Sequence, residues 1–207
     1  MDKQTEILSG QGASEALEAG GGKYELALVH NMVGGFAERI RDRTRKVTGD
    51  RHYEGYDKDW QKECDEVQQD VDAMKAQENI FVVTENGKPV GMASVKKIGN
   101  DPNTGREVWE IIQVSVLEWA EGRSHSARLI TAAIEGVRQR NPFADVLIAT
   151  SNDAIAHVCG RMGVPRIPIE HLYQIKHGTM DVTPFREEME QARTHAKDYL
   201  LPAERKF

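Results

Sequence analysis

The chain has 207 residues, of which 39% are hydrophobic and 29% are charged. This apolar content is enough for a packed core and excludes a wholly disordered chain, while the length suits one domain with extensions. The net charge of -6 and the aromatic content of 6% argue against nucleic acid as a partner. Surfaces that bind nucleic acids are basic, and many of them stack bases on aromatic rings.

The sequence also argues against membrane and secretory classes. No stretch approaches the ~18 consecutive apolar residues of a membrane span, and the first residues lack the basic start and apolar core of a secretory signal. The two cysteines, Cys64 and Cys159, cannot form a disulfide framework and suit a reducing compartment. We therefore expect a cytoplasmic protein with no membrane partner.

The N-terminal residues 1–22 contain few large apolar side chains and end in three consecutive glycines. We interpret them as a flexible tail that ends in a hinge and that could bind a protein partner. Apolar residues then recur about every four positions from Tyr24 to Ile40, which predicts a helix. A strand over Glu25–Val29 followed by a helix from Phe36 is the alternative.

Two charged segments follow. Residues 39–46 are basic and fit a solvated helix end, with phosphate contact as the alternative. Residues 59–77 form a second predicted helix whose apolar stripe includes Cys64 and Val71 and whose other face is acidic. This acidic face would attract a cationic substrate.

The middle of the chain has the pattern of strands. Residues 80–84 are rich in β-branched side chains, residues 85–88 carry the Asn-Gly hairpin signal, and residues 89–97 form the return strand. After a turn over 99–105, residues 108–117 form a third strand. The sequence therefore predicts a three-stranded antiparallel meander.

Helices and strands alternate in the last third. We expect a helix over 126–140, a buried strand over 144–150 and a helix that Asn152 caps and Gly163 ends. An alternating strand over 167–176 and a final helix over 183–201, opened by Thr183-Pro184, complete the prediction. The expected division is a tail (1–22), one domain (23–178) and a helical extension (179–207).

This order predicts an α+β fold in which an antiparallel meander joins a partly parallel strand–helix–strand unit. Ligands of such sheets bind near the carboxyl ends of strands, and a helix start favours anions. The loop at that place is Glu118–His125.

The chain resembles the GNAT superfamily of N-acetyltransferases. The family signature, roughly L-A-V-x-P-x-Y-R-G-x-G-I-G before a Leu-rich helix, falls without gaps on Val114–Ser126, and Leu129 and Ile130 follow it. A second signature, roughly A-x-x-L-Y-E-K-x-G-F, falls on Ile155–Val164. The resemblance covers about residues 78–177, and residues 24–77 would be the first two helices of the family.

Several positions depart from the family pattern. Ser124 and Ser126 replace two signature glycines, Glu121 replaces the usual Arg or Gln, and Cys159 replaces the catalytic Tyr. Serine keeps the backbone N–H, but a non-glycine residue at positive φ costs roughly 1–2 kcal/mol. Glu121 adds a negative charge that Arg123 partly offsets. The chain thus resembles a degenerate member, of a kind found in bacteriophage genomes and sometimes in virions.

The resemblance implies acetyl-CoA as co-substrate and no metal. In the family, successive N–H groups of the loop bind the pyrophosphate, and the backbone of the preceding strand supplies the oxyanion donor. His125 could bind phosphate when protonated, or could be a solvated loop histidine. The expected cofactor-binding residues are Val114, Val116, Gly122, Arg123, Ser124, His125, Ser126 and Asn152.

The catalytic candidates are Glu110 and Cys159. Glu110 lies on the strand that leads into the loop and could act as general base, or could be an ordinary strand carboxylate. Cys159 occupies the position of the family's proton donor, or fills the core as a small apolar residue. His171 and Tyr173 share one face of the last predicted strand and could line the acceptor pocket, or could serve packing.

Two classes of function remain. The first is an acetyl-CoA-dependent N-acetyltransferase that acts on an amine. The second is a catalytically inactive scaffold that serves assembly, for example in a virion, which the degenerate loop and the appended ends favour. The acceptor, the acyl group and the oligomeric state stay open.

Overall fold

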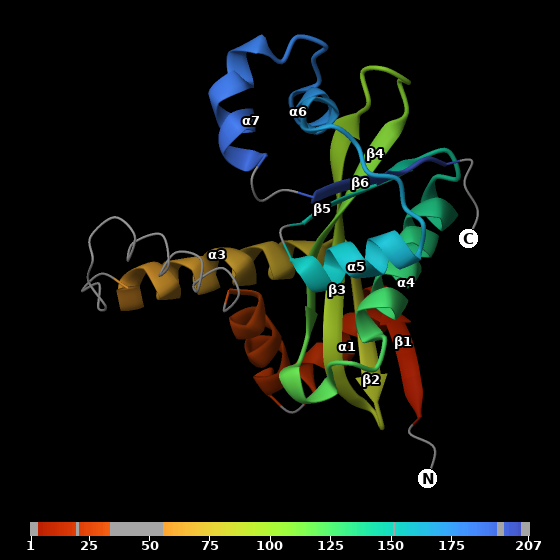
Figure 1. The fold of residues 1–207 in the computed structure, drawn as a ribbon. Helices are drawn as coiled ribbons and strands as arrows, with labels where there is room; N and C mark the ends of the chain where they lie inside the picture. The colour runs from red at the N-terminus through yellow and green to blue at the C-terminus, as the bar shows by residue number, and fades with distance from the viewer. Residues whose placement is uncertain (1–3, 20, 34–55, 151, 194–196, 204–207) are drawn as a thin grey trace. The chain divides into compact units, whose positions relative to one another are not determined.

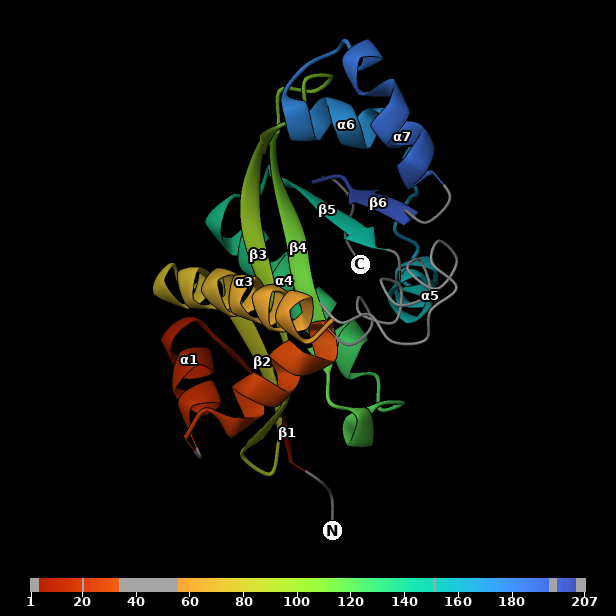
Figure 2. The same ribbon diagram turned by 90° about the vertical axis from the view of Figure 1, so that its left-hand side faces the viewer.

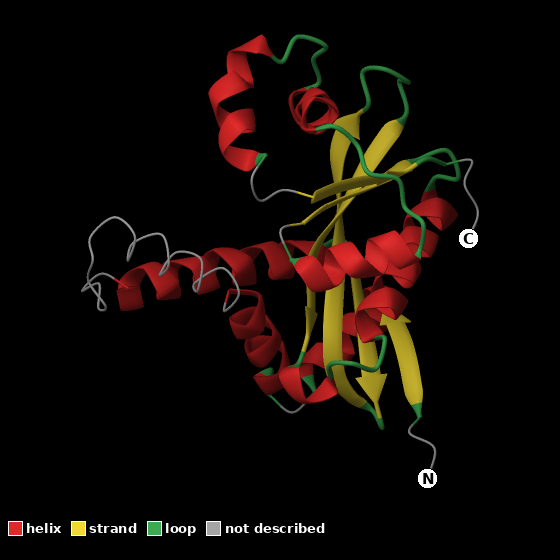
Figure 3. Cartoon of the chain, viewed as in Figure 1, coloured by secondary structure: helices red, strands yellow, loops and turns green. Residues whose placement is uncertain are grey.

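The computed structural model describes residues 4–19, 21–33, 56–150, 152–193 and 197–203 (Figures 1 and 3). The chain forms two compact units. We name Met1–Ser94 with Gln113–His125 the N-terminal unit, and Val95–Ile112 with Ser126–Phe207 the C-terminal unit.

A mixed six-stranded sheet has the order β1-β2-β3-β4-β5-β6. Its strands are Thr5–Ser9, Ile80–Glu85, Lys88–Asn100, Glu107–Val116, Asp145–Thr150 and Lys197–Leu201. Strands β1, β2 and β3 pair antiparallel, β4 and β5 pair parallel, and β5 and β6 pair antiparallel. This confirms the expected α+β fold with a meander joined to a parallel strand–helix–strand unit.

The N-terminal residues form a strand and a helix, which corrects the expectation of a flexible tail. Strand β1 pairs with β2, with Ser9 opposite Phe81, and α1 (Gly10–Glu18) buries Ala13 and Leu17 completely. Gly10 has φ 56°, so this glycine turns the chain from strand to helix. Few apolar residues are present in the segment, and the core covers Ala13 and Leu17 while Ile7 stays 38% exposed.

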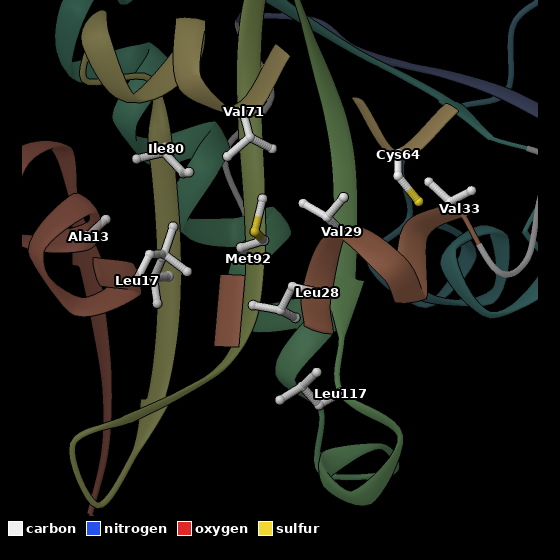
Figure 4. Close-up of a cluster of buried hydrophobic side chains, with 11 residues drawn as sticks. Ala13, Leu17, Leu28, Val29, Val33, Cys64, Val71, Ile80, Met92 and Leu117 are labelled. Carbon is white, nitrogen blue, oxygen red and sulfur yellow. The ribbon is translucent and has the colours of Figure 1, made fainter. Parts of the chain in front are cut away.

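The predicted helix from Tyr24 is confirmed over residues 23–33, where Leu28, Val29 and Val33 are buried. Phe36, Ile40 and the basic segment 39–46 lie outside the described residues. Helix α3 (Tyr56–Ala76) confirms the second predicted helix. Figure 4 shows how these helices, α1 and the sheet share one core cluster. It comprises Ala13, Leu17, Leu28, Val29, Val33, Cys64, Val71, Ile80, Val82, Met92 and Leu117.

A buried ion pair joins the helices of this unit. Lys75 Nζ on α3 lies 3.1 Å from Glu25 Oε2 and 3.4 Å from Glu18 Oε1. Burial opposes the charge of Lys75, but the two carboxylates outweigh burial and raise its pKa. Two of the chain's carboxylates, Glu18 and Glu25, therefore pair with Lys75 and help to hold the helices together.

The Asn-Gly hairpin is confirmed, because Asn86 and Gly87 have φ 51° and 72° as a type I′ turn requires. In the next turn, Asp101 accepts hydrogen bonds from the backbone N–H and the side chain of Asn103. Its Oδ2 lies 3.1 Å from His171 Nε2. Burial would raise the pKa of Asp101, but these hydrogen bonds lower it.

The C-terminal unit contains most of α4 (His125–Arg140), with α5 (Asp153–Arg161), α6 (Ile169–His177) and α7 (Arg186–Ala192). Asn152 caps α5 as predicted, since its Oδ1 accepts from the N–H groups of Ala154 and Ile155. Helices α6 and α7 pack on β5 and β6 through a cluster that includes Leu147, Leu172, Met189 and Leu200 (Figure 2).

Two predictions for the end of the chain are wrong. Most of the segment 167–176, expected as a strand, lies in α6 (Ile169–His177) instead, because Ile169, Leu172 and Ile175 recur at helical spacing and are the buried side chains. The expected helix over 183–201 is a short 3-10 turn (Thr183–Phe185), α7 and β6. Strand β6 pairs with β5, so a boundary at residue 178 does not end the sheet.

Candidate functional site

The loop between β4 and α4 has an unusual backbone. After a 3-10 turn over Glu118–Ala120, Gly122 and Ser124 have φ 74° and 63°, and α4 begins at His125. Residues with positive φ also occur in turns whose successive backbone N–H groups bind anions. Ser124 stands where the family signature has glycine. Because serine has a Cβ, its positive φ costs roughly 1–2 kcal/mol.

The N–H groups of this loop are available for a ligand. No backbone carbonyl in the described part of the chain accepts a hydrogen bond from Gly122, Arg123 or Ser124. The first N–H groups of α4 also lack intrahelical partners, as in every helix. The helix dipole adds positive potential at the same place.

Exchanging the residues at the two left-handed positions should shift stability in opposite directions. Ser124→Gly should raise the free energy of unfolding by up to about 1 kcal/mol, and Gly122→Ala should lower it by about 1 kcal/mol. A Cβ at Gly122 meets no atom within 4 Å, so the change reports on the backbone alone. Urea denaturation measures both free energies of unfolding. If both substitutions changed the free energy in the same direction, either Gly122 or Ser124 would not have positive φ.

Arg123 and His125 both contact Glu85 at the end of β2. Arg123 Nη1 lies 2.6 Å from Glu85 Oε2, and His125 Nε2 lies 2.9 Å from Glu85 Oε1. His125 is buried, which excludes the solvated loop histidine of the sequence analysis. Ser126 follows inside α4 and is half-buried.

Strand β4 is irregular where the family signature begins. Gln113 has φ 55°, and its side chain is held by Ser94 and Asp70. Val114 follows half-exposed, and Val116 is buried and accepts a hydrogen bond of 2.6 Å from Asn31 Nδ2. The role of Val114 and Val116 toward a carbonyl oxygen stays a prediction.

Glu110 lies on the part of β4 that pairs with β5, opposite Leu147. Its side chain is 15% exposed, and Lys176 Nζ on α6 is 3.7 Å from Glu110 Oε1. A second carboxylate, Asp198 on β6, is buried, and its Oδ1 has no hydrogen-bond partner in the described structure. Burial raises the pKa of Asp198, and the charge of Glu110 adds to this, while Lys176 and Arg166 act against it.

Cys159 is fully buried on α5, and burial raises the pKa of its thiol to about 11. A thiol in this position stays protonated at neutral pH, and its burial fits packing. Its role as a proton donor stays a prediction. The Asn152 side chain caps α5, because its Oδ1 accepts a hydrogen bond from the Ala154 N–H.

His171 and Tyr173 lie on α6, which corrects their placement on a strand. Residues two apart on a helix point to different sides, so they do not share a face. His171 contacts Asp101, whereas the Tyr173 ring lies 5.6 Å from that of His177. Their role in an acceptor pocket stays a prediction.

Sequence reasoning missed Glu85 and Asp198. Both carboxylates lie within strands whose other residues are mostly apolar, and their partners are remote in the chain. Within the described residues, no group of three His, Cys, Asp or Glu side chains could hold a metal ion. No helix among the described residues is long and apolar enough to cross a membrane.

Solved structures resemble the chain in fold. A GNAT family acetyltransferase from Streptococcus agalactiae matches with TM-score 0.55 and 12% identity, over 97% of this chain and 96% of that one. N-acetylglutamate synthase from Neisseria gonorrhoeae, complexed with coenzyme A and N-acetyl-glutamate, matches with TM-score 0.52 and 11% identity. That match covers 99% of this chain but only 36% of the synthase.

The sequence comparisons show the family. A putative acetyltransferase from Agrobacterium tumefaciens is 30% identical over 47% of this chain and 69% of its own, with TM-score 0.39. No curated protein matches. The model of the acetyltransferase (GNAT) family matches residues 45–163, which is more than half of the chain. This protein therefore belongs to the GNAT family of acetyltransferases.

Proposed function

We propose that this protein is an acetyl-CoA-dependent N-acetyltransferase that acts on an amine. The observation that carries the proposal is the loop at Gly122–His125, in which Gly122 and Ser124 both have positive φ although Ser124 stands where the family signature has glycine. Positive φ is unfavourable for serine, and unfavourable backbone conformations of this kind cluster at functional sites.

The residues present fit the pyrophosphate of coenzyme A. The space beside Gly122 is open, and the loop N–H groups have no backbone acceptor among the described residues. Acetyl-CoA, when bound, supplies an acyl group activated as a thioester. The loop N–H groups of this chain would hold the phosphates, and the backbone of Val114 and Val116 would face the carbonyl oxygen, as in the family.

Glu110 is the residue that we assign to the proton of the acceptor amine. Of the two carboxylates on β4, Glu110 lies nearer the family signature than Glu107. Its side chain is 15% exposed, which leaves it accessible. An amine reacts as a nucleophile only after it loses its proton, and a positioned carboxylate can accept that proton.

The scaffold alternative loses the features that suggested it. The supposed tail contributes β1 and the buried residues Ala13 and Leu17 of α1. The supposed helical extension contributes β6 to the sheet. Both ends are thus parts of the fold, and binding of a partner through a free N-terminal tail has no support from them.

Isothermal calorimetry with coenzyme A tests the proposal. We expect a dissociation constant in the micromolar range, and far weaker binding of pantetheine, which carries the same thiol arm without the pyrophosphate. Binding of coenzyme A should also weaken with salt, since it involves anionic phosphates. Absence of heat with millimolar coenzyme A, or equal affinity for the two ligands, would contradict the proposal.

A further inference from the structure

Glu85 is the last residue of β2, and its side chain is only 5% exposed. Such burial is unusual for a carboxylate unless both oxygens have partners. Here Oε2 lies 2.6 Å from Arg123 Nη1, and Oε1 lies 2.9 Å from His125 Nε2. Both partners come from the loop before α4, which lies 38 and 40 residues further along the chain.

The two contacts flank Ser124, the residue with φ 63°. Arg123 is also fixed by its Nη2, which donates to the carbonyl oxygen of Trp119 at 3.1 Å. His125 is fixed by burial, since its side chain is only 2% exposed. A backbone conformation that is unfavourable for serine persists only where its surroundings determine it from both sides. The contacts of Glu85 with Arg123 and His125 constrain the backbone on both sides of Ser124.

The charge of Glu85 by itself would weaken binding of a phosphate ligand. A carboxylate beside a phosphate site repels the ligand, and here it also engages the guanidinium of Arg123. Its presence in the core next to this loop therefore needs another explanation than attraction of the ligand. Holding the loop in the shape that directs its N–H groups outward is an explanation that the contacts supply.

We propose that Glu85 is a positioning residue for the pyrophosphate loop, which holds Ser124 in the left-handed conformation through Arg123 and His125. This inference rests on the proposed function, because it assumes that the loop binds coenzyme A. It makes backbone N–H groups, and not the side chains of Arg123 and His125, the groups that contact the phosphates.

The test compares two substitutions that remove the same charge. Glu85→Gln should weaken coenzyme A binding about tenfold in calorimetry, because the amide has one acceptor oxygen where the carboxylate has two, and it lacks the charge that pairs with Arg123. Glu121→Gln removes an exposed carboxylate from the same loop and should leave the affinity equal or raise it. Equal or tighter binding by the Glu85 variant would overturn the proposal, since electrostatic repulsion alone predicts that result.

A second substitution separates positioning from loss of folding. Glycine adopts positive φ without a Cβ penalty, so Ser124→Gly should restore most of the affinity that Glu85→Gln loses. A general defect in folding would not be repaired by one glycine in the loop. If the double variant binds as weakly as Glu85→Gln although circular dichroism shows both to be folded, the link between Glu85 and Ser124 is wrong.

A third measurement needs no ligand and keeps this inference distinct from the proposed function. The NMR coupling constant between the amide proton and the Hα of Ser124 reports φ, and it should change in the free Glu85→Gln variant and stay unchanged in Glu121→Gln. If the natural protein does not bind coenzyme A, the proposed function fails. An unchanged coupling constant in Glu85→Gln would then show separately that Glu85 does not hold the loop.

Discussion

Glu110→Gln is expected to lower kcat for acetyl transfer about a hundredfold while it changes the KM for acetyl-CoA by no more than about twofold. Glutamine keeps the shape of the side chain and removes the ability to accept a proton from the acceptor amine. A residue that acts only on the proton contributes to the transition state and not to binding of the acyl donor. Steady-state release of free thiol with a set of primary amines measures both constants.

The matched control is Glu135→Gln on α4, an exposed carboxylate in the same compact unit. It should leave kcat and KM unchanged, because a distant surface charge has little effect at physiological salt. Glu110 would be an ordinary strand carboxylate, and not the general base, if its glutamine variant transferred acetyl groups at the natural rate.

Leu17→Ala is expected to lower the free energy of unfolding by about 3 kcal/mol, which is typical of a leucine removed from a packed core. Leu17 lies on α1, is fully buried and belongs to the same core cluster as Leu28 and Ile80. A flexible tail would predict no change. Urea denaturation followed by circular dichroism measures the difference.

Leu26→Ala provides the control for this prediction. Leu26 lies on the neighbouring helical segment 23–33 but is 53% exposed, so its truncation should change stability by less than about 0.5 kcal/mol. If the two alanine variants unfold at the same urea concentration, α1 does not contribute to the core.

The elements that the sequence predicted well are those with signals in adjacent residues. The turn at Asn86 and Gly87 depends on two residues that tolerate positive φ, and the α5 cap depends on one Asn side chain two residues from its partner. Helix α3 follows from periodicity over many residues. Local signals of this kind need no knowledge of the rest of the chain.

The elements that were mispredicted are short segments whose state depends on distant partners. Strand β1 has five residues and pairs with β2, which lies more than seventy residues further on. Strand β6 also has five residues, and Tyr199 fitted a helical stripe although it pairs with Ile148 of β5. Segments of this length favour neither state strongly, so the pairing partner decides.

The candidate site divides in the same way. The family signature located the loop from Gly122 to Ser126, and the substitution of glycine by Ser124 raised the question of positive φ, which the backbone confirms. The partner of the loop could not be predicted, because Glu85 looked like an ordinary residue at the start of a hairpin turn. Only its burial and its contacts with Arg123 and His125 give it a role.

The sequence by itself determined the family, the meander and the position of the loop, because these depend on residues that are close together in the chain. The tertiary structure alone decided that both ends belong to the fold, that His171 and Tyr173 lie on a helix, and that a buried carboxylate holds the loop. These features depend on strand pairing and burial, which bring together residues that carry no signal of each other in the sequence.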